Sequence, residues 1–173
     1  MNIDKRILDL VLDMTSSCPG FYEAFIKELE THGKDVNFHL TDFNRIKIAG
    51  WCQDPKNIFI SHELKETHPF LFTLFVLLHE SMHTNHGSWK DACSKDFAGF
   101  KEDISKYEEE ANGYALGVLE RLQSVGFAKD LKHLIFVTNM QINQAKFTFD
   151  HQYRPVYDNF GGELCLEHLG EKL

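Results

Sequence analysis

The sequence predicts one α+β domain over residues 1–173, in which a small antiparallel or mixed sheet packs on a central helix and on a second helix that carries a glutamate. Three observations support this fold class. Apolar residues recur at helical spacing near the N-terminus and after residue 100, partly alternating segments lie between residues 36 and 64, and a continuous apolar run follows them. A hydrophobic content of 43% over 173 residues is enough for one buried core.

Two amphipathic helices are expected at the N-terminus. The first runs from Asn2 to Met14, with Asn2 or Asp4 as its cap, and the second runs from Phe21 to Glu30. A Pro-Gly pair separates them, because both residues interrupt helices. We interpret both helices as scaffold, since neither carries a chemical motif.

Three strands are expected next, at residues 36–40, 45–52 and 57–64. The sequence Asp-Pro-Lys-Asn at residues 54–57 is a turn signal, so the last two strands should form a hairpin. An exposed edge strand can bind an extended peptide through its main chain, and Asn57 to His62 is the candidate for that edge. An ordinary packed strand is an equally open alternative.

The central helix is expected to begin at Pro69 and to stop near Gly87. It is apolar nearly all round from Phe70 to Leu78, so it should be buried rather than amphipathic. This apolar run ends in the sequence His79-Glu80-Ser81-Met82-His83, which needs a chemical explanation.

The spacing of this motif suits a metal ion. Residues four apart lie on one face of a helix, so His79 and His83 can direct ring nitrogens at the same Zn²⁺. Glu80 lies beside them, where it can act as a general base towards a water molecule without being a ligand. The alternative is a buried helix that ends in exposed histidines. The order His-Glu-x-x-His is the signature of zinc peptidases, and a matching third ligand downstream favours the metal site.

A long helix is expected from Phe100 to Val125. Its apolar face consists of Ile104, Tyr107, Ala111, Ala115, Val118 and Leu122. At 100° per residue Glu108 falls on this face, whereas Glu109 and Glu110 point away from it. A lone carboxylate on a packed face is costly unless a positive group meets it, and a zinc ion is such a group. Glu108 is therefore the expected third ligand.

Neighbouring residues are assigned by the same helical geometry. Asn112 lies one turn beyond Glu108, where its carbonyl can accept the spare ring N–H of a ligating histidine. Glu109 and Glu110 are expected to form a solvated acidic face. His86 lies two turns beyond His79 and cannot share the metal if the helix continues, so it is expected to be exposed at the rim of the site. A substrate or second-shell role for His86 is the alternative.

The C-terminal part is less regular, with a helix expected from Asp130 to Met140 and an aromatic, irregular segment from Phe147 to Phe160. In a zinc peptidase, a Tyr, His or Arg near the metal can stabilise the oxyanion. The candidates here, for which simple packing is the alternative, are His151, Tyr153, Arg154 and Tyr157.

Composition restricts the partners and the compartment. A net charge of −8 argues against nucleic acid, which requires clustered Lys and Arg. No signal peptide is recognised, and the longest apolar run is too short to span a bilayer, so no membrane partner is expected. Four scattered cysteines without a C-x-x-C pair favour reduced thiols in the cytoplasm, and these are Cys18, Cys52, Cys93 and Cys165.

Two motifs occur together within about residues 58–119: His79-Glu80-x-x-His83, and Tyr-Glu-Glu-Glu-Ala-Asn-Gly-Tyr-Ala at residues 107–115. In this the chain resembles the ImmA/IrrE family of zinc metallopeptidases. That family pairs H-E-x-x-H with a later helix of the form E-x-E-A-[ND]-x-[FY]-A, whose first glutamate completes the zinc site. The resemblance implies zinc ligands at His79, His83 and Glu108, a general base at Glu80 and a supporting role for Asn112.

The same resemblance implies a compact zincin-like fold of the gluzincin type, with one catalytic Zn²⁺ and hydrolysis of a peptide bond in a protein substrate. Known members cut or inactivate transcriptional repressors and often occur in phages or mobile elements. The chain departs from the usual H-E-L-G-H, lacks the Leu-Leu-Met-Pro that often follows the glutamate helix, and shows no preceding helix-turn-helix. The alternative from another class is a zincin-fold regulator, weakly active or inactive, that acts by binding a protein partner.

Overall fold

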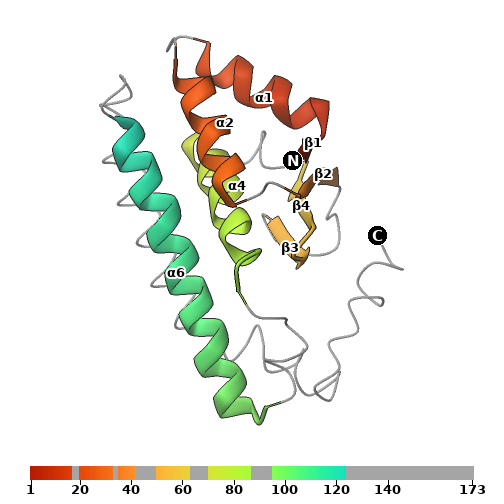
Figure 1. Cartoon of the computed structure of the whole chain (residues 1–173), viewed down its shortest axis with the longest axis vertical. Helices are drawn as coiled ribbons and strands as arrows, with labels where there is room; N and C mark the ends of the chain where they lie inside the picture. Colours follow the sequence, from red (N-terminus) through yellow and green to blue (C-terminus); the bar gives the residue numbers. More distant parts are fainter. Residues whose placement is uncertain (17–19, 33–34, 42–49, 63–69, 87–94, 124–173) are drawn as a thin grey trace.

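A computed structural model of the chain describes residues 1–16, 20–32, 35–41, 50–62, 70–86 and 95–123 (Figure 1). These residues combine helices with one small sheet, as the α+β prediction requires. The helices are α1 (Lys5–Thr15), α2 (Phe21–His32), α4 (Phe70–His83) and α6 (Phe97–Gln123). The strands are β1 (Asn2–Ile3), β2 (Asn37–Thr41), β3 (Gly50–Asp54) and β4 (Asn57–Ser61). The helix predicted from Asp130 to Met140 lies outside the described residues.

The first helix begins later than predicted because the chain starts as a strand. Asn2 and Ile3 pair with β2, and Asp4 then caps α1 by accepting a hydrogen bond from the backbone N–H of Arg6. Gly20, at φ 84°, lies in the left-handed region immediately before α2, and its carbonyl accepts from the N–H of Ala24. Of the two caps considered for the first helix, the structure uses Asp4.

The sheet is mixed and has the strand order β1-β2-β4-β3. The first three strands in this order are parallel, and β3 is antiparallel to β4, so the antiparallel alternative is wrong for most of the sheet. The predicted hairpin between the last two strands is confirmed. Its turn is stabilised by Asp54, whose side chain accepts from the backbone N–H of Lys56 at 2.7 Å.

The prediction that Asn57 to His62 form an edge is wrong. Within β4, Ile58 pairs with Phe38 of β2 on one side and with Cys52 of β3 on the other. Hydrogen-bonding groups on both sides of β4 are therefore used inside the sheet. The hairpin folds β3 to the outside, which makes β3 the outermost strand of the described sheet on this side.

Helix α4 lies between the sheet and α6 (Figure 1) and contacts both. Its residues Leu74, Leu77 and Leu78 are fully buried, which confirms a central rather than a surface helix. The predicted apolar face of α6 is confirmed at its buried residues Ile104, Ala111, Ala115, Val118 and Leu122, whereas Tyr107 is only partly buried. Phe100 and Leu119 are buried as well. The two alanines let the backbones of α4 and α6 approach closely.

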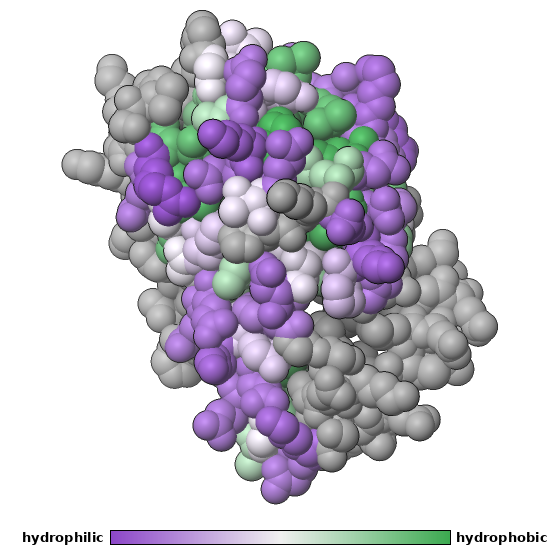
Figure 2. All heavy atoms as spheres, viewed as in Figure 1, coloured by the Kyte–Doolittle hydropathy of each residue, from purple (hydrophilic) through white to green (hydrophobic). Residues whose placement is uncertain are grey.

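The opposite side of α6 is polar, and Figure 2 shows mainly hydrophilic side chains over the N-terminal half of this helix. The helix starts at Phe97, three residues before the predicted start, because the side chain of Asp96 accepts from the N–H of Gly99 and so caps it. No helix in the described part combines the length and the apolar character needed to cross a bilayer.

Candidate metal centre

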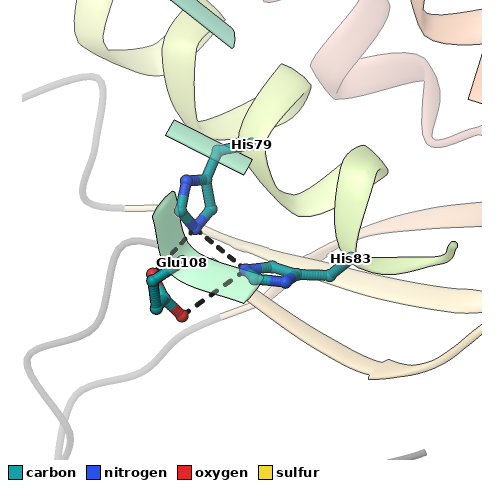
Figure 3. A group of neighbouring side chains, drawn as sticks. All are labelled: His79, His83 and Glu108. Carbon is teal, nitrogen blue, oxygen red and sulfur yellow. Dashed lines mark hydrogen bonds and ion pairs between the residues drawn. The ribbon is translucent and has the colours of Figure 1, made fainter. Parts of the chain in front are cut away.

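Three side chains from two helices converge on one another (Figure 3). His79 and His83 lie one turn apart on α4, and Glu108 reaches them from α6. The Nε2 atoms of the two histidines are 3.0 Å apart. The carboxylate oxygens of Glu108 lie 3.3 Å from Nε2 of His79 and 3.5 Å from Nε2 of His83. Helical phase therefore placed all three side chains on the correct faces.

These separations fit a single ion. Ligand atoms that surround Zn²⁺ tetrahedrally at about 2.1 Å are roughly 3.4 Å from one another. The two histidine nitrogens are 3.0 Å apart, and each has one oxygen of the Glu108 carboxylate 3.3–3.5 Å away, Oε2 beside His79 and Oε1 beside His83. Two imidazole nitrogens and one carboxylate oxygen form a donor set that is frequent in catalytic zinc sites and leaves the fourth position for water or substrate. The cluster of His79, His83 and Glu108 can thus hold a metal ion.

Strong electrostatic coupling links the three groups. Burial opposes protonation of His79, but the hydrogen bond and charge of Glu108, with the charge of Glu80, raise the pKa of His79 to about 9. Burial lowers the pKa of His83 to about 3, and the positive charge of His79 adds to the effect. Burial disfavours the charged form of Glu108, yet the contact with His79 lowers its pKa to about 2. The negative charge of Glu108 thus favours a positive charge on the neighbouring His79.

The proton on His79 makes metal binding pH-dependent. A metal ion can bind this ring only after the proton has left, so protons compete with the ion below the pKa of about 9. Affinity should rise about tenfold per pH unit between pH 7 and pH 9 and then level off, because about one proton is released per ion. Competition with a chromophoric chelator across this pH range measures the slope. A flat profile would contradict the assigned protonation of His79.

Asn112 of α6 forms a hydrogen bond that orients the His79 ring. The Nδ1 atom of this ring lies 2.9 Å from Oδ1 of Asn112, so the ring donates its Nδ1–H to the side-chain oxygen. This contact fixes the tautomer in which Nε2 has a free lone pair directed at the cluster. Asn112 follows Glu108 by four residues, and α6 therefore presents both side chains to α4.

Glu80 belongs to α4 but faces β3 instead of α6. Successive helix residues are about 100° apart, so Glu80 lies beside the ligand His79 without joining the three-ligand cluster. It is only 8% exposed, and burial raises the pKa of its carboxyl to about 7 against the opposing charge of His79. The backbone N–H of Cys52 in β3 donates a hydrogen bond to this carboxyl, and the Cys52 thiol is free and buried.

Gly50 at the start of β3 is a site residue that the sequence analysis missed. A Cβ atom built on Gly50 would lie 2.7 Å from Cγ of Glu80 and 2.8 Å from Cγ1 of Val76. Both distances are shorter than carbon atoms tolerate, so only glycine allows β3 to approach α4 this closely. A glycine inside a predicted strand is the sequence signal for such an approach.

Gly50→Ala is expected to displace Glu80 or to push β3 away from α4. Val76 is buried and branched, so it cannot move cheaply, and overpacking of this kind costs roughly 1–3 kcal/mol of stability. Metal affinity should change much less than the free energy of unfolding, because Gly50 touches no ligand. Denaturant unfolding and metal titration of the same variant provide the comparison. Unchanged stability would show that the helix and strand are not closely packed in solution.

The expected exposure of His86 is wrong. Helix α4 ends at His83, and the following turn, in which the N–H of His86 donates to the carbonyl of His83, folds the side chain back towards α6. The side chain of His86 is 6% exposed, and its Nε2 atom lies 3.3 Å from Oε2 of Glu110. Glu110 is exposed as predicted, but it pairs with both His86 and Lys106 and is not simply solvated.

Several predicted residues cannot be placed at this site. The oxyanion candidates His151, Tyr153, Arg154 and Tyr157 lie outside the described residues, as do Cys18, Cys93 and Cys165. Glu109 is exposed on α6 and is not part of the metal cluster. No protein-family model, no curated protein sequence and no solved structure matches this chain.

Proposed function

We propose that this chain is a zincin-like, zinc-dependent peptidase that hydrolyses a peptide bond in a protein substrate. The observation that carries the proposal is the convergence of His79, His83 and Glu108 on one point, with the buried carboxyl of Glu80 beside them. A structural metal site would use four protein ligands, whereas the described part of the chain supplies three at this cluster.

A zinc ion at this cluster supplies Lewis-acid chemistry, because it polarises a scissile carbonyl and lowers the pKa of water. The protein supplies the proton transfer. Glu80 accepts the proton of the attacking water and delivers it to the leaving amine. Burial raises the pKa of this carboxyl, which makes it a better proton acceptor than an exposed glutamate.

Strand β3 is the proposed binding edge for the substrate. In the described sheet β3 pairs with β4 alone, so its other side can accept an extended peptide. The backbone of β3 also contacts the general base, through the N–H of Cys52 and the close approach of Gly50. A peptide added to this edge would therefore lie along Glu80. We therefore propose Gly50–Asp54, and not Asn57 to His62, as the edge strand that binds the substrate.

The substrate class follows from the resemblance to ImmA/IrrE peptidases, which implies a transcriptional repressor as the protein that is cut. The acidic character of the chain agrees with a protein rather than a nucleic-acid substrate. The cytoplasm, where such a repressor acts, is the proposed compartment.

Sequencing of newly formed protein N-termini tests the proposal. A bacterial proteome is incubated with the zinc-loaded protein, with the chelator-treated protein and with chelated protein to which zinc is returned. New N-termini are expected in the first and third reactions and should be missing from the second. Identical products in all three reactions, or no products from a zinc-loaded sample, would be evidence against a zinc peptidase.

A further inference from the structure

The second motif histidine has a partner on the side of its ring that faces away from the cluster. Nδ1 of His83 lies 2.9 Å from Nδ1 of His86, and the two ring planes meet at 67°. An edge-on approach of this kind suits a hydrogen bond between the two nitrogens and excludes parallel stacking. His83 thus directs Nε2 at the cluster and Nδ1 at His86.

His86 is itself held by two residues of α6. Its ring stacks on Tyr107, with ring centres 4.5 Å apart and planes within 14°. Its Nε2 atom lies 3.3 Å from Oε2 of Glu110. This buried nitrogen makes no hydrogen bond of standard geometry to any described residue, so the Glu110 carboxylate is the charged group that faces it. Tyr107 and Glu110 are three apart and lie on the same side of α6.

When His83 is a ligand, its tautomer also determines the tautomer of neutral His86. Nε2 of His83 must keep its lone pair for the metal, so the proton is on Nδ1 and is donated to His86. Nδ1 of His86 is then an acceptor, and the proton of His86 is on Nε2. The carboxylate of Glu110 faces this proton, with its Oε2 atom 3.3 Å from Nε2. Each contact thereby selects the tautomer of the next ring.

We propose that His86 and Glu110 are positioning residues that hold His83 in the tautomer and orientation required of a metal ligand. The inference depends on the metal centre of the proposed function, and it supplies for His83 what Asn112 supplies for His79. Both ligating rings are then oriented from α6, one directly and one through His86. Removing a residue that hydrogen-bonds a metal ligand typically lowers metal affinity or activity 10–100-fold.

Matched substitutions at His86 separate hydrogen bonding from packing. His86→Phe keeps an aromatic ring against Tyr107 and removes both nitrogens, whereas His86→Asn loses the ring and keeps an oxygen near the position of Nδ1. Zinc affinity should fall about 10–100-fold in the Phe variant and recover substantially in the Asn variant. The absorption spectrum of the Co²⁺-loaded Phe variant should also shift. Without the hydrogen bond to residue 86, the His83 ring can bind the metal in a different orientation.

Substitutions at the exposed Glu110 test the far end of the chain without disturbing the core. Glu110→Ala should reduce zinc affinity by about 10-fold. Glu110→Gln keeps an acceptor oxygen and should reduce the affinity less. Glu109→Gln is the control with the same charge change, and it should behave as the parent.

The outcomes distinguish this inference from the proposed function. If the parent protein binds no zinc, the metal centre is wrong. If the parent binds zinc and both His86→Phe and Glu110→Ala keep its affinity and its cobalt spectrum, the positioning role is wrong and the metal centre stands. If His86→Phe does not fold, the two Glu110 variants decide the question.

Discussion

Glu80→Gln is expected to keep the fold and the metal and to reduce peptide hydrolysis by about 10²–10⁴-fold. The amide has nearly the same shape as the carboxyl, and Glu80 is not one of the three clustered ligands, so metal content should equal that of the parent. The loss comes from the missing proton acceptor. Single-turnover cleavage of a peptide identified in the proteome experiment measures the effect, with metal content and thermal unfolding of the same sample as controls.

The same variant decides between an enzyme and a binding protein. A zincin-fold regulator acts through its surface, and removing the buried carboxyl of Glu80 leaves the surface intact. If Glu80→Gln kept the full biological effect of the parent, the regulator hypothesis would be correct and the peptidase hypothesis wrong. Glu109→Gln is the control for this comparison, because it also removes one negative charge, but from an exposed position.

The second large effect is expected at Glu108, the proposed ligand that α6 contributes. Glu108→Gln replaces an anionic ligand by a neutral one, and Glu108→Ala removes it, so zinc affinity should fall steeply in both. Asn112→Ala should cause a smaller loss of about 10–100-fold, because His79 keeps its nitrogen but not its orientation. Competition titration against a chelator of known affinity ranks these variants.

Glu109→Gln is the matched control for this series. It should change neither metal content nor, by more than about 0.5 kcal/mol, the free energy of unfolding. A Glu109 variant that lost zinc while the Glu108 variant kept it would show that the rotational position of α6 is wrong. Glu110 is unsuitable as a second control, because its contact with His86 connects it to His83.

Helical phase explains why the ligands could be predicted from sequence. The positions of His79, His83, Glu108 and Asn112 depend only on the 100° rotation per residue and on which face is apolar. Both quantities are local, so no knowledge of the tertiary structure was needed. The same argument placed Glu109 and Glu110 correctly on the exposed side of α6.

The errors arose where the path of the chain matters. His86 was assigned by assuming that the helix continues, yet α4 ends at His83 and the turn reverses the direction of the side chain. Strand order is likewise not a local property: a hairpin can add either of its strands to β2, and this chain adds β4 and leaves β3 outside. Gly50 was overlooked because its partner, Glu80, is distant in sequence.

The two-helix origin of the metal ligands also has a consequence for the lifetime of the protein. An ion bound to His79, His83 and Glu108 cross-links α4 to α6, and it binds the folded chain in preference to the unfolded one. Removal of the metal should therefore make the chain easier for proteases to cut. The metal supply would then influence how long the protein persists, as well as whether the proposed chemistry can occur.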